Sequence, residues 1–253
     1  MVASFARWFG KVAVVTGASS GIGAAITKRL VEEGMTVVGV ARRKERIENI
    51  AKTLRNKNAQ LFGFQVDITK EEELINAFKW TTDNVGPVHV LVNSAGINLA
   101  HSLEEGNLQI WKKILETNVL AVCISTREAI KIMKEHDIDG HIINVNSVLG
   151  HKVVSPASPL YTASKFSITS LTESLRLEQN LRNSKIKITS ISPGAVDTPI
   201  LSEEFRTTKY FMEILQKSLL NPEDIADATV YVLSTPPHVQ VHELTVKGVN
   251  EPF

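Results

Sequence analysis

Short apolar runs rich in Val and Ile alternate along the chain with longer segments in which apolar residues recur every three or four positions. The first pattern is typical of buried strands, and the second of helices that pack by one face. Strands are therefore predicted at residues 11–15, 36–40, 60–66, 88–93, 140–146, 185–191 and 241–246. Helices are predicted between them, at about residues 24–33, 44–55, 70–84, 111–136 and 161–182, with a last one after residue 221.

Capping residues mark two of these helix ends. Gly34 follows the first helix, where glycine commonly adopts the left-handed conformation that ends a helix. Asn221 and Pro222 stand in the order expected of an N-cap and a first helical residue. Strands that alternate with helices predict a parallel sheet with helices on both faces. With no linker or repeat, residues 1–253 are expected to form a single α/β domain of about seven strands.

Several residues with polar or turn-forming character stand where predicted strands end. They are Thr16, Asn93, Ser147 and Pro193. Because ligands of parallel α/β sheets bind beyond the carboxyl ends of the strands, these residues are predicted to border one cleft.

A glycine-rich segment, Gly17-x-x-x-Gly21-x-Gly23, lies between the first predicted strand and the first helix. Glycines allow the backbone to approach a pyrophosphate, and the N-terminus of the next helix supplies N–H donors and positive potential. This context predicts a Rossmann-type, doubly wound sheet that binds a dinucleotide. The alternative is a tight turn without a ligand. A Walker A loop is excluded, since no Gly-Lys-Ser/Thr follows.

The end of the second strand bears on which dinucleotide is bound. Sites for NAD place a carboxylate there, whereas this chain has Arg42 and Arg43. Two guanidinium groups can pair with a 2′-phosphate, so the sequence favours NADP. The alternative is a solvated basic helix face, which describes the residues that follow, namely Lys44, Arg46, Lys52 and Arg55.

Tyr161 and Lys165 are four residues apart in a predicted helix, so their side chains lie on the same face. A phenol with its ordinary pKa of about 10 is a poor base at neutral pH. A nearby ammonium group favours the phenolate and is expected to lower that pKa. Ser147 and Asn118 would complete a catalytic site, whereas the alternative is an exposed Tyr–Lys pair without chemistry.

Composition and charge limit the classes of partner. The 28 Lys and Arg residues against 27 Asp and Glu residues give a formal net charge of +1, which suggests neither nucleic acid nor an anionic membrane as partner. No run approaches the about 18 apolar residues of a membrane span, and residues 1–10 lack the apolar core of a signal peptide. The chain is expected to be soluble and cytoplasmic, with residues 1–10 packed on the domain as a short arm.

Cysteine and histidine residues indicate no additional chemistry. The single cysteine, Cys123, lies in an apolar run from Val119 to Ile124 and is expected to be a buried, inert thiol. The seven histidines lack the spacing of metal ligands, so no metal site is predicted.

Six motifs in a fixed order resemble those of the short-chain dehydrogenases/reductases, over nearly the whole chain. They are Thr16-Gly-Ala-Ser-Ser-Gly-Ile-Gly23, Asn93-Ser-Ala-Gly96, Asn118, Ser147, Tyr161-x-x-x-Lys165 and Ser192-Pro-Gly194. Ser94 stands where the family more often has Ala, which is a small change. Within the family, residues 35–43, 192–198 and 238–244 resemble the insect group of farnesol dehydrogenase-like and antennal dehydrogenase-like proteins.

This resemblance implies roles for four catalytic residues, Asn118, Ser147, Tyr161 and Lys165. Tyr161 would exchange a proton with the substrate oxygen, and Lys165 would lower the pKa of Tyr161 and bind the nicotinamide ribose. Ser147 would orient the substrate oxygen, and Asn118 would hold a water in a proton relay.

The resemblance also implies a set of residues that bind NADP(H). They are Gly17, Ser19, Ser20, Gly21, Ile22, Gly23, Arg42, Arg43, Asp67, Ile68, Asn93, Ala95, Gly96, Tyr161, Lys165, Pro193, Gly194, Val196 and Thr198. Asp67 would contact the adenine, and it could equally serve as the N-cap of the helix that follows.

Residues 199–220 correspond to a flexible lid over the substrate in this family. The segment is rich in apolar side chains, which suggests a lipophilic substrate. These side chains include Phe205, Tyr210, Phe211, Met212, Ile214 and Leu215. The alternative is a short amphipathic helix that packs on the domain.

The leading hypothesis is an NADP(H)-dependent oxidoreductase that interconverts a lipophilic alcohol and its aldehyde or ketone, with a terpenoid alcohol such as farnesol as substrate. A steroid ketone reductase, for example one acting on an ecdysteroid, is the nearest alternative. A 3-oxoacyl reductase is disfavoured because no basic patch for a carrier protein stands out. A non-enzymatic NADP(H) sensor is disfavoured because Tyr161 and Lys165 are both present. By analogy with the family, a homodimer or homotetramer is expected through the helices at 111–136 and 161–182.

Overall fold

The computed structural model describes residues 4–54, 59–154, 156–213 and 215–252. Arg55 and Ile214, both named above, lie outside these ranges. The described part of the chain contains a seven-stranded parallel sheet with the order β3-β2-β1-β4-β5-β6-β7. Its strands are β1 (Val12–Thr16), β2 (Thr36–Ala41), β3 (Leu61–Gln65), β4 (Val88–Asn93), β5 (His141–Val145), β6 (Lys187–Pro193) and β7 (Glu243–Val246). Each predicted strand is confirmed, with ends shifted by at most two residues.

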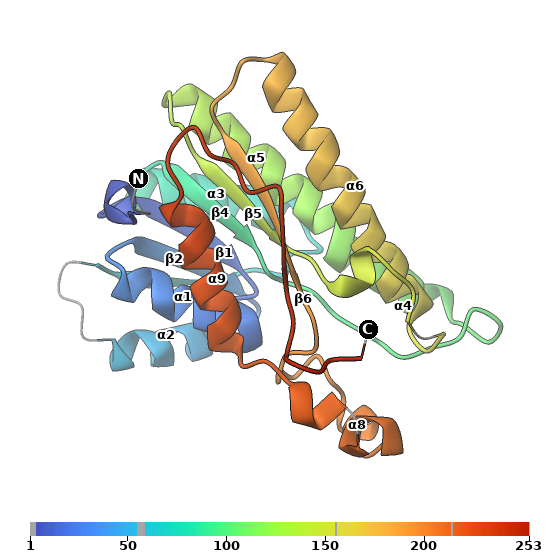
Figure 1. The fold of residues 1–253 in the computed structure, drawn as a ribbon. Coiled ribbons are helices and arrows are strands. Elements are labelled where there is room, and N and C mark those ends of the chain that lie inside the picture. Colours follow the sequence, from blue (N-terminus) through green and yellow to red (C-terminus); the bar gives the residue numbers. More distant parts are fainter. Residues whose placement is uncertain (1–3, 55–58, 155, 214, 253) are drawn as a thin grey trace.

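Helices cover both faces of this sheet, as the alternation of patterns predicted (Figure 1). The crossover from β3 to β4 places β4 beside β1 and reverses the direction in which strands are added, and this reversal opens a crevice at the carboxyl ends of β1 and β4. The helices are α1 (Gly21–Glu32), α2 (Lys44–Thr53), α3 (Glu71–Asn84), α4 (Leu108–Leu115), α5 (Ala121–Glu135), α6 (Pro159–Leu181), α7 (Glu203–Arg206), α8 (Lys209–Glu213) and α9 (Pro222–Ser234).

Two hydrophobic cores form because successive side chains of a strand point to opposite faces of the sheet. In β4, Val90 and Val92 join the core beneath α1, α2 and α9, whereas Leu91 joins the core beneath α3 and α5. All three side chains are fully buried. Each contributes about 1.5–3 kcal/mol through removal of its surface from water. The sheet is therefore buried on both faces, which explains why its strands are continuous apolar runs.

The N-terminal arm packs on the domain, as predicted. Trp8, in a short 3-10 helix over Ala6–Trp8, is buried and its indole N–H donates to the carbonyl oxygen of Leu233 at 2.8 Å. The predicted caps are also confirmed. Gly34 has φ of +94°, and the backbone N–H of Asn221 donates to Asp224 at 2.7 Å in a capping box at the start of α9.

The helical segment predicted over residues 111–136 is present, but it is not one regular α-helix. Helix α4 begins earlier, at Leu108, and a π-helical turn over Glu116–Leu120 separates it from α5. A π turn inserts an extra residue and rotates the side chains that follow, which a 3.6-residue period does not reveal. This turn carries Asn118, so the irregularity lies at the candidate site.

The prediction for Cys123 is also wrong. Its thiol is exposed, although partial burial raises its pKa. The run Val119–Ile124 was apolar enough to suggest a buried segment, and it is helical, as predicted. Successive residues of a helix point about 100° apart, so one face of even an apolar run can face outward.

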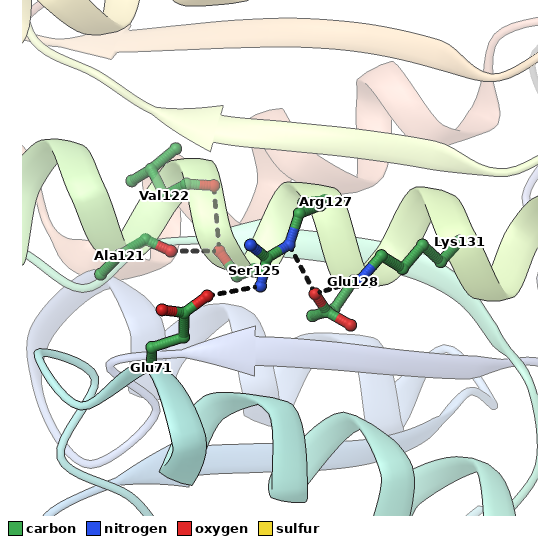
Figure 2. Close-up of polar contacts among 7 residues, drawn as sticks. All are labelled: Glu71, Ala121, Val122, Ser125, Arg127, Glu128 and Lys131. Carbon is green, nitrogen blue, oxygen red and sulfur yellow. Dashed lines mark hydrogen bonds and ion pairs between the residues drawn. The ribbon is translucent and has the colours of Figure 1, made fainter.

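An ion-pair network joins α5 to α3 over the sheet (Figure 2). The Arg127 guanidinium donates to Glu128 at 2.6 Å and to Glu71 of α3 at 2.9 Å, and Lys131 donates to Glu128 at 2.9 Å. One turn earlier, the hydroxyl of Ser125 donates within its own helix to the carbonyl of Ala121 at 2.8 Å. The network links two of the helices that cover this face of the sheet.

None of the described helices is both long and apolar enough to cross a membrane.

Candidate functional site

The glycine-rich turn after β1 brings the backbone unusually close to neighbouring segments. Gly17 has φ of +72°, and a Cβ on it would come within 2.8 Å of the Cα of Ala95. A Cβ on Gly23 would overlap the carbonyl oxygen of Gly17. Ser20 is the N-cap of α1 but makes no capping hydrogen bond with its side chain. The N-terminus of α1 therefore keeps N–H groups available for an anion.

A cavity of about 780 Å³ opens in front of this turn. Its volume lies in the range of cofactor and ligand sites. Most of the residues predicted to bind NADP(H) line it, namely Gly17, Ser19, Ser20, Gly21, Ile22, Gly23, Arg42, Arg43, Asp67, Ile68, Ala95, Gly96 and Thr198. Residues that are distant in the sequence thus meet at one edge of the sheet, although the four strand-end residues predicted to border the cleft, Thr16, Asn93, Ser147 and Pro193, do not themselves line it.

Other predicted cofactor residues stand behind or beside the cavity and do not line it. The Asn93 amide is used within the protein, since it donates to Asn144 at 2.9 Å and accepts from Ser125 at 2.6 Å. Pro193 ends β6, and the N–H of Gly194 donates to Val246 of β7. Val196 is buried. Tyr161 and Lys165 belong to the catalytic group described below.

Sequence reasoning missed one wall of the cavity. Residues of α4 and of the loop after β4 face the glycine turn and complete the enclosure. A helical period places several α4 residues on one face, but the sequence did not indicate which face meets the cavity. The lining residues that were not predicted are Val40, Ala41, Val66, Thr69, Lys70, Ser94, Ile97, Asn98, Leu99, Gln109, Lys112, Lys113, Glu116, Thr117, Pro199 and Ile200.

Basic side chains border the cavity beyond the end of β2. Arg43 donates to the hydroxyl of Ser20 at 3.3 Å, which holds one guanidinium beside the glycine turn. Arg42 also lines the cavity. No carboxylate follows β2 directly, because the strand ends at Ala41 and the next two residues are arginines. The nearest carboxylate in the lining along the chain is Asp67, which comes after β3.

Asp67 does not cap α3, so that alternative is wrong. The N-cap of α3 is Lys70. The carboxylate of Asp67 instead accepts from the N–H and the hydroxyl of Thr69, at 3.1 and 2.8 Å. Burial would raise the pKa of Asp67, but the hydrogen bonds from Thr69 and the charges of Arg42 and Lys70 outweigh it and lower that pKa. Asp67 is therefore an anion fixed at the cavity wall.

Ser147, Tyr161 and Lys165 meet beyond the end of β5. The hydroxyl of Ser147 accepts from the N–H of Leu149 at 3.1 Å and is hydrogen-bonded to the phenol of Tyr161. The Lys165 ammonium donates to the carbonyl of Val145 at 2.9 Å and lies 5.7 Å from the centre of the Tyr161 ring. The three side chains come from two elements, the turn after β5 and the first two turns of α6.

The group of Ser147, Tyr161 and Lys165 adjoins the cavity at Gly96. A Cβ on Gly96 would lie 4.0 Å from the Lys165 ammonium and 3.5 Å from the amide oxygen of Asn118. Gly96 itself lines the cavity. A ligand that fills the cavity can therefore approach Lys165 and Asn118.

The pKa of Tyr161 is shifted in the direction opposite to the one predicted. Burial raises it to about 12, because a phenolate would lose its hydration, and the hydrogen bond with Ser147 offsets this only in part. Burial likewise lowers the pKa of Lys165 to about 8. Loss of water, and not the charge of the neighbouring group, is the main cause of both shifts. The phenol is thus protonated at neutral pH.

Asn118 is held by hydrogen bonds to two segments. Its amide N–H₂ donates to the Ile97 carbonyl at 2.9 Å and to the hydroxyl of Ser164 at 3.0 Å. Its amide oxygen accepts from the N–H of Ile97 at 2.9 Å. Asn118 therefore ties the loop after β4 to α6, next to Lys165.

Among the described residues, no group of three or more His, Cys, Asp or Glu side chains is arranged to hold a metal ion. His141, which is fully buried, pairs with Thr189 at 2.8 Å and lies at the start of β5, away from the carboxyl ends.

Known proteins resemble this chain over nearly its full length. The family model described as short chain dehydrogenase matches residues 11–209. Farnesol dehydrogenase of Aedes aegypti is 48% identical over 98% of this chain and 99% of its own. Dehydrogenase/reductase SDR family member 11 of Bos taurus is 39% identical over 97% of this chain and 98% of its own.

Solved structures agree in fold. One is an alcohol dehydrogenase of the archaeon Thermococcus sibiricus, described as complexed with 5-hydroxy-NADP. It superposes with a TM-score of 0.82 at 27% identity and covers 96% of this chain and 98% of its own. Fold, site and sequence relatives lead to one conclusion: this chain belongs to the short-chain dehydrogenase family and is an oxidoreductase of the alcohol dehydrogenase type.

Proposed function

We propose that this chain is an NADP(H)-dependent oxidoreductase that interconverts a lipophilic alcohol and its aldehyde or ketone, with a terpenoid alcohol such as farnesol as substrate. The observation that carries the proposal is the position of the Ser147–Tyr161–Lys165 group, which adjoins a dinucleotide-sized cavity at Gly96. The similarity to the Aedes farnesol dehydrogenase supports the substrate class.

The residues of the cavity fit a dinucleotide. Gly17 and Gly23 allow close backbone contacts in the turn that a Cβ would prevent, and the start of α1, which no side chain caps, suits a pyrophosphate. Arg42 and Arg43 are assigned to the 2′-phosphate of NADP, because guanidinium groups pair well with phosphates and no carboxylate follows β2. The cofactor supplies the hydride when it is bound.

The protein residues supply the proton and the orientation of the substrate. The protonated Tyr161 donates its proton to the carbonyl oxygen in reduction, and Ser147 orients that oxygen. Lys165 holds the nicotinamide ribose, and its charge stabilises the phenolate that remains after proton transfer. Asn118 has one acceptor position left on its amide oxygen, and we assign it to a relay water that restores the proton.

Residues 199–220 are assigned to cover the substrate. Phe211 and Leu215 are buried against the domain, and the rings of Phe205 and Phe211 meet edge to face at 5.7 Å. Tyr210 and Met212 remain exposed. The two predictions for this segment are thus compatible, because its short helices pack by one side and keep apolar groups free for a lipophilic substrate.

The test is a steady-state assay of the purified chain with NADPH and NADH against a panel of aldehydes and ketones, and of farnesol and sterols with NADP⁺ and NAD⁺. We expect turnover of terpenoid substrates with the phosphorylated cofactor. Turnover of sterols alone would indicate a steroid substrate and would contradict the terpenoid assignment. Binding of NADPH without turnover on any substrate of the panel would contradict the proposed enzyme.

The assignment of Arg42 gives a specific prediction. Arg42→Ala should raise the KM for NADPH by about ten- to a hundredfold, because a charge-assisted pair worth about 1.5–3 kcal/mol is lost. The KM for NADH should change little. Arg46→Ala is the matched control, since Arg46 is exposed on α2 and does not line the cavity. Equal losses with both cofactors would contradict the assignment.

A further inference from the structure

A buried carboxylate near the C-terminus contacts the segments that border the candidate site. Glu251 is 8% exposed, although it lies in the last turn of the described chain. Its two carboxylate oxygens accept from the N–H groups of Ala195 and Gly248, each at 3.3 Å. A Cβ on Gly194 would overlap this carboxylate, so the group packs flat against the backbone that follows β6.

The same backbone holds the end of the segment assigned as the lid. The N–H of Leu220 donates to the carbonyl of Ala195 at 2.9 Å, and the N–H of Asp197 donates to the carbonyl of Leu220 at 2.8 Å. Val196 and Leu220 form a parallel bridge. The backbone of residues 195–197 is therefore hydrogen-bonded to the C-terminal end of the lid on one side and to the Glu251 carboxylate on the other.

The C-terminal turn also touches the lid directly. A Cβ on Gly248 would overlap the backbone carbonyl of Ser218, the last residue of the 3-10 helix at Leu215–Ser218. Asn250 adopts φ of +67°, which closes the turn, and the N–H of Glu251 donates to Gly248 at 3.1 Å. The C-terminal turn thus packs between the lid and the end of β6.

Ion pairing does not account for the burial of the Glu251 carboxylate. Burial raises its pKa, and the N–H groups of Gly248 and Ala195 and the charges of Lys247 and Lys152 lower it only in part. Burial, and after it the charge of Glu251, raises the pKa of the Tyr210 phenol in the lid, so this phenol lies within electrostatic range of the carboxylate. A buried carboxylate held mainly by backbone donors costs stability, so its position calls for another reason.

We propose that Glu251 is a positioning residue that fixes the Gly194–Asp197 backbone. Through this backbone, Glu251 also holds the C-terminal end of the substrate lid in place. The inference rests on the proposed function for its effect on turnover. The residues it holds follow Pro193 at the carboxyl end of β6 and precede the segment assigned as the lid. Loss of the carboxylate should free the backbone of residues 194–197 and loosen the lid without altering the part of the cavity that holds the adenosine end of the cofactor.

The experiment compares Glu251→Ala and Glu251→Gln with the unaltered chain and with Glu135→Gln, which replaces an exposed carboxylate at the end of α5. Protease cleavage within residues 199–220, mapped by mass spectrometry, reports the lid. Binding of 2′,5′-ADP reports the adenosine end of the cofactor site, and kcat with the best substrate of the panel reports positioning.

For Glu251→Ala we expect cleavage in the lid about tenfold faster, since local opening exposes the segment. A kcat about tenfold lower is expected from a misplaced site wall. Affinity for 2′,5′-ADP should stay within about threefold, because the phosphate-binding elements are untouched. For Glu251→Gln, the cleavage rate and kcat should lie between those of Glu251→Ala and those of the unaltered chain. The Gln amide keeps one acceptor oxygen but turns an N–H₂ toward the other donor.

Cleavage within about twofold of the unaltered chain would overturn the inference, because the opening would then be unchanged. So would a loss of 2′,5′-ADP affinity parallel to the loss of kcat, since that would indicate general unfolding. If the unaltered chain shows no turnover, the proposed function fails, and the cleavage rates still decide the role of Glu251.

Discussion

At the scale of single residues, burial decides the chemistry of the site. Tyr161 and Lys165 share a pocket from which water is largely excluded, and each is driven toward its neutral form. A phenol that stays protonated is ready to donate a proton, and an ammonium with a pKa of about 8 can still be charged at neutral pH. Under the proposed function, the protonated phenol is the form that reduction of a carbonyl uses, and oxidation of an alcohol needs the phenolate first.

Tyr161→Phe tests the proton donor. Removal of the hydroxyl should lower kcat by about 10²- to 10⁴-fold, the usual contribution of a general acid, while NADPH binding stays nearly intact. Fluorescence titration of NADPH and steady-state kinetics measure the two effects. Tyr231→Phe, at an exposed position on α9, is the control. Substantial turnover by Tyr161→Phe would overturn the mechanism.

The shifts in pKa predict opposite pH profiles for the two directions. Because burial lowers the pKa of Lys165 to about 8, its ammonium is present below that pH and is lost above it. Carbonyl reduction should therefore decline above about pH 8, although Tyr161 keeps its proton up to about pH 12. Alcohol oxidation uses the phenolate, and its rate should rise with pH because the phenolate fraction increases toward the Tyr161 pKa of about 12. A reduction rate that stays level from pH 7 to 10 would contradict this role of Lys165.

At the scale of elements, two kinds of contact hold α5 in place. Its apolar face is buried, with Ala129 and Met133 fully enclosed. Its polar edge carries the ion pairs of Figure 2, in which Arg127 and Glu71 are about half exposed and Glu128 is mostly buried. Exposed pairs are screened by water and contribute little, so the buried face supplies most of the attachment.

Arg127→Ala should therefore lower the free energy of unfolding by less than about 1 kcal/mol, since Lys131 still pairs with Glu128. The double variant Arg127→Ala/Lys131→Ala should cost more than the sum of the single changes, because it leaves the Glu128 carboxylate without either cation. Urea unfolding of the two single variants and the double variant measures the difference. Additive changes in the free energy of unfolding would contradict this prediction, because they would show that water solvates the Glu128 carboxylate when both cations are lost.

At the scale of the whole molecule, apolar groups remain uncovered on the outer face of the α5–α6 layer. Leu120 is 54% exposed in the π turn before α5, and Phe166 is 41% exposed on α6. These elements lie on the same side of the sheet in Figure 1, opposite α1 and α9. Members of this family are commonly oligomeric, and exposed apolar residues of this kind suit an interface between copies.

We expect the chain to form at least a homodimer through this face. The double variant Leu120→Glu/Phe166→Glu should elute as a monomer, because charges placed in an apolar interface are not solvated there. Tyr231→Glu changes α9 on the opposite face and should leave at least the dimer intact. Light scattering coupled to size-exclusion chromatography measures the masses. A monomeric unaltered chain would contradict the prediction.

Much of the fold followed from the sequence because the relevant signals are local. Apolar runs such as Val88–Asn93 could only be buried strands between helices, and Gly34 and Asn221 marked helix ends through their own backbone preferences. The π turn at Glu116–Leu120 and the outward face of Cys123 escaped prediction, since the helical register there depends on packing against other segments. The same holds for the wall of the cavity that α4 provides.

The sequence by itself determined the family, the order of strands and helices, and the chemical types present at the ends of the strands. These properties depend on motifs and periodicities that lie within single segments. Only the tertiary structure decided the environment of each group. It placed Tyr161 and Lys165 in a shared dry pocket, which reversed the expected direction of the phenol pKa, and it brought Glu251 onto the backbone after β6. Electrostatic energies depend on solvent exclusion and on neighbours distant in the chain, and those exist only once the chain has folded.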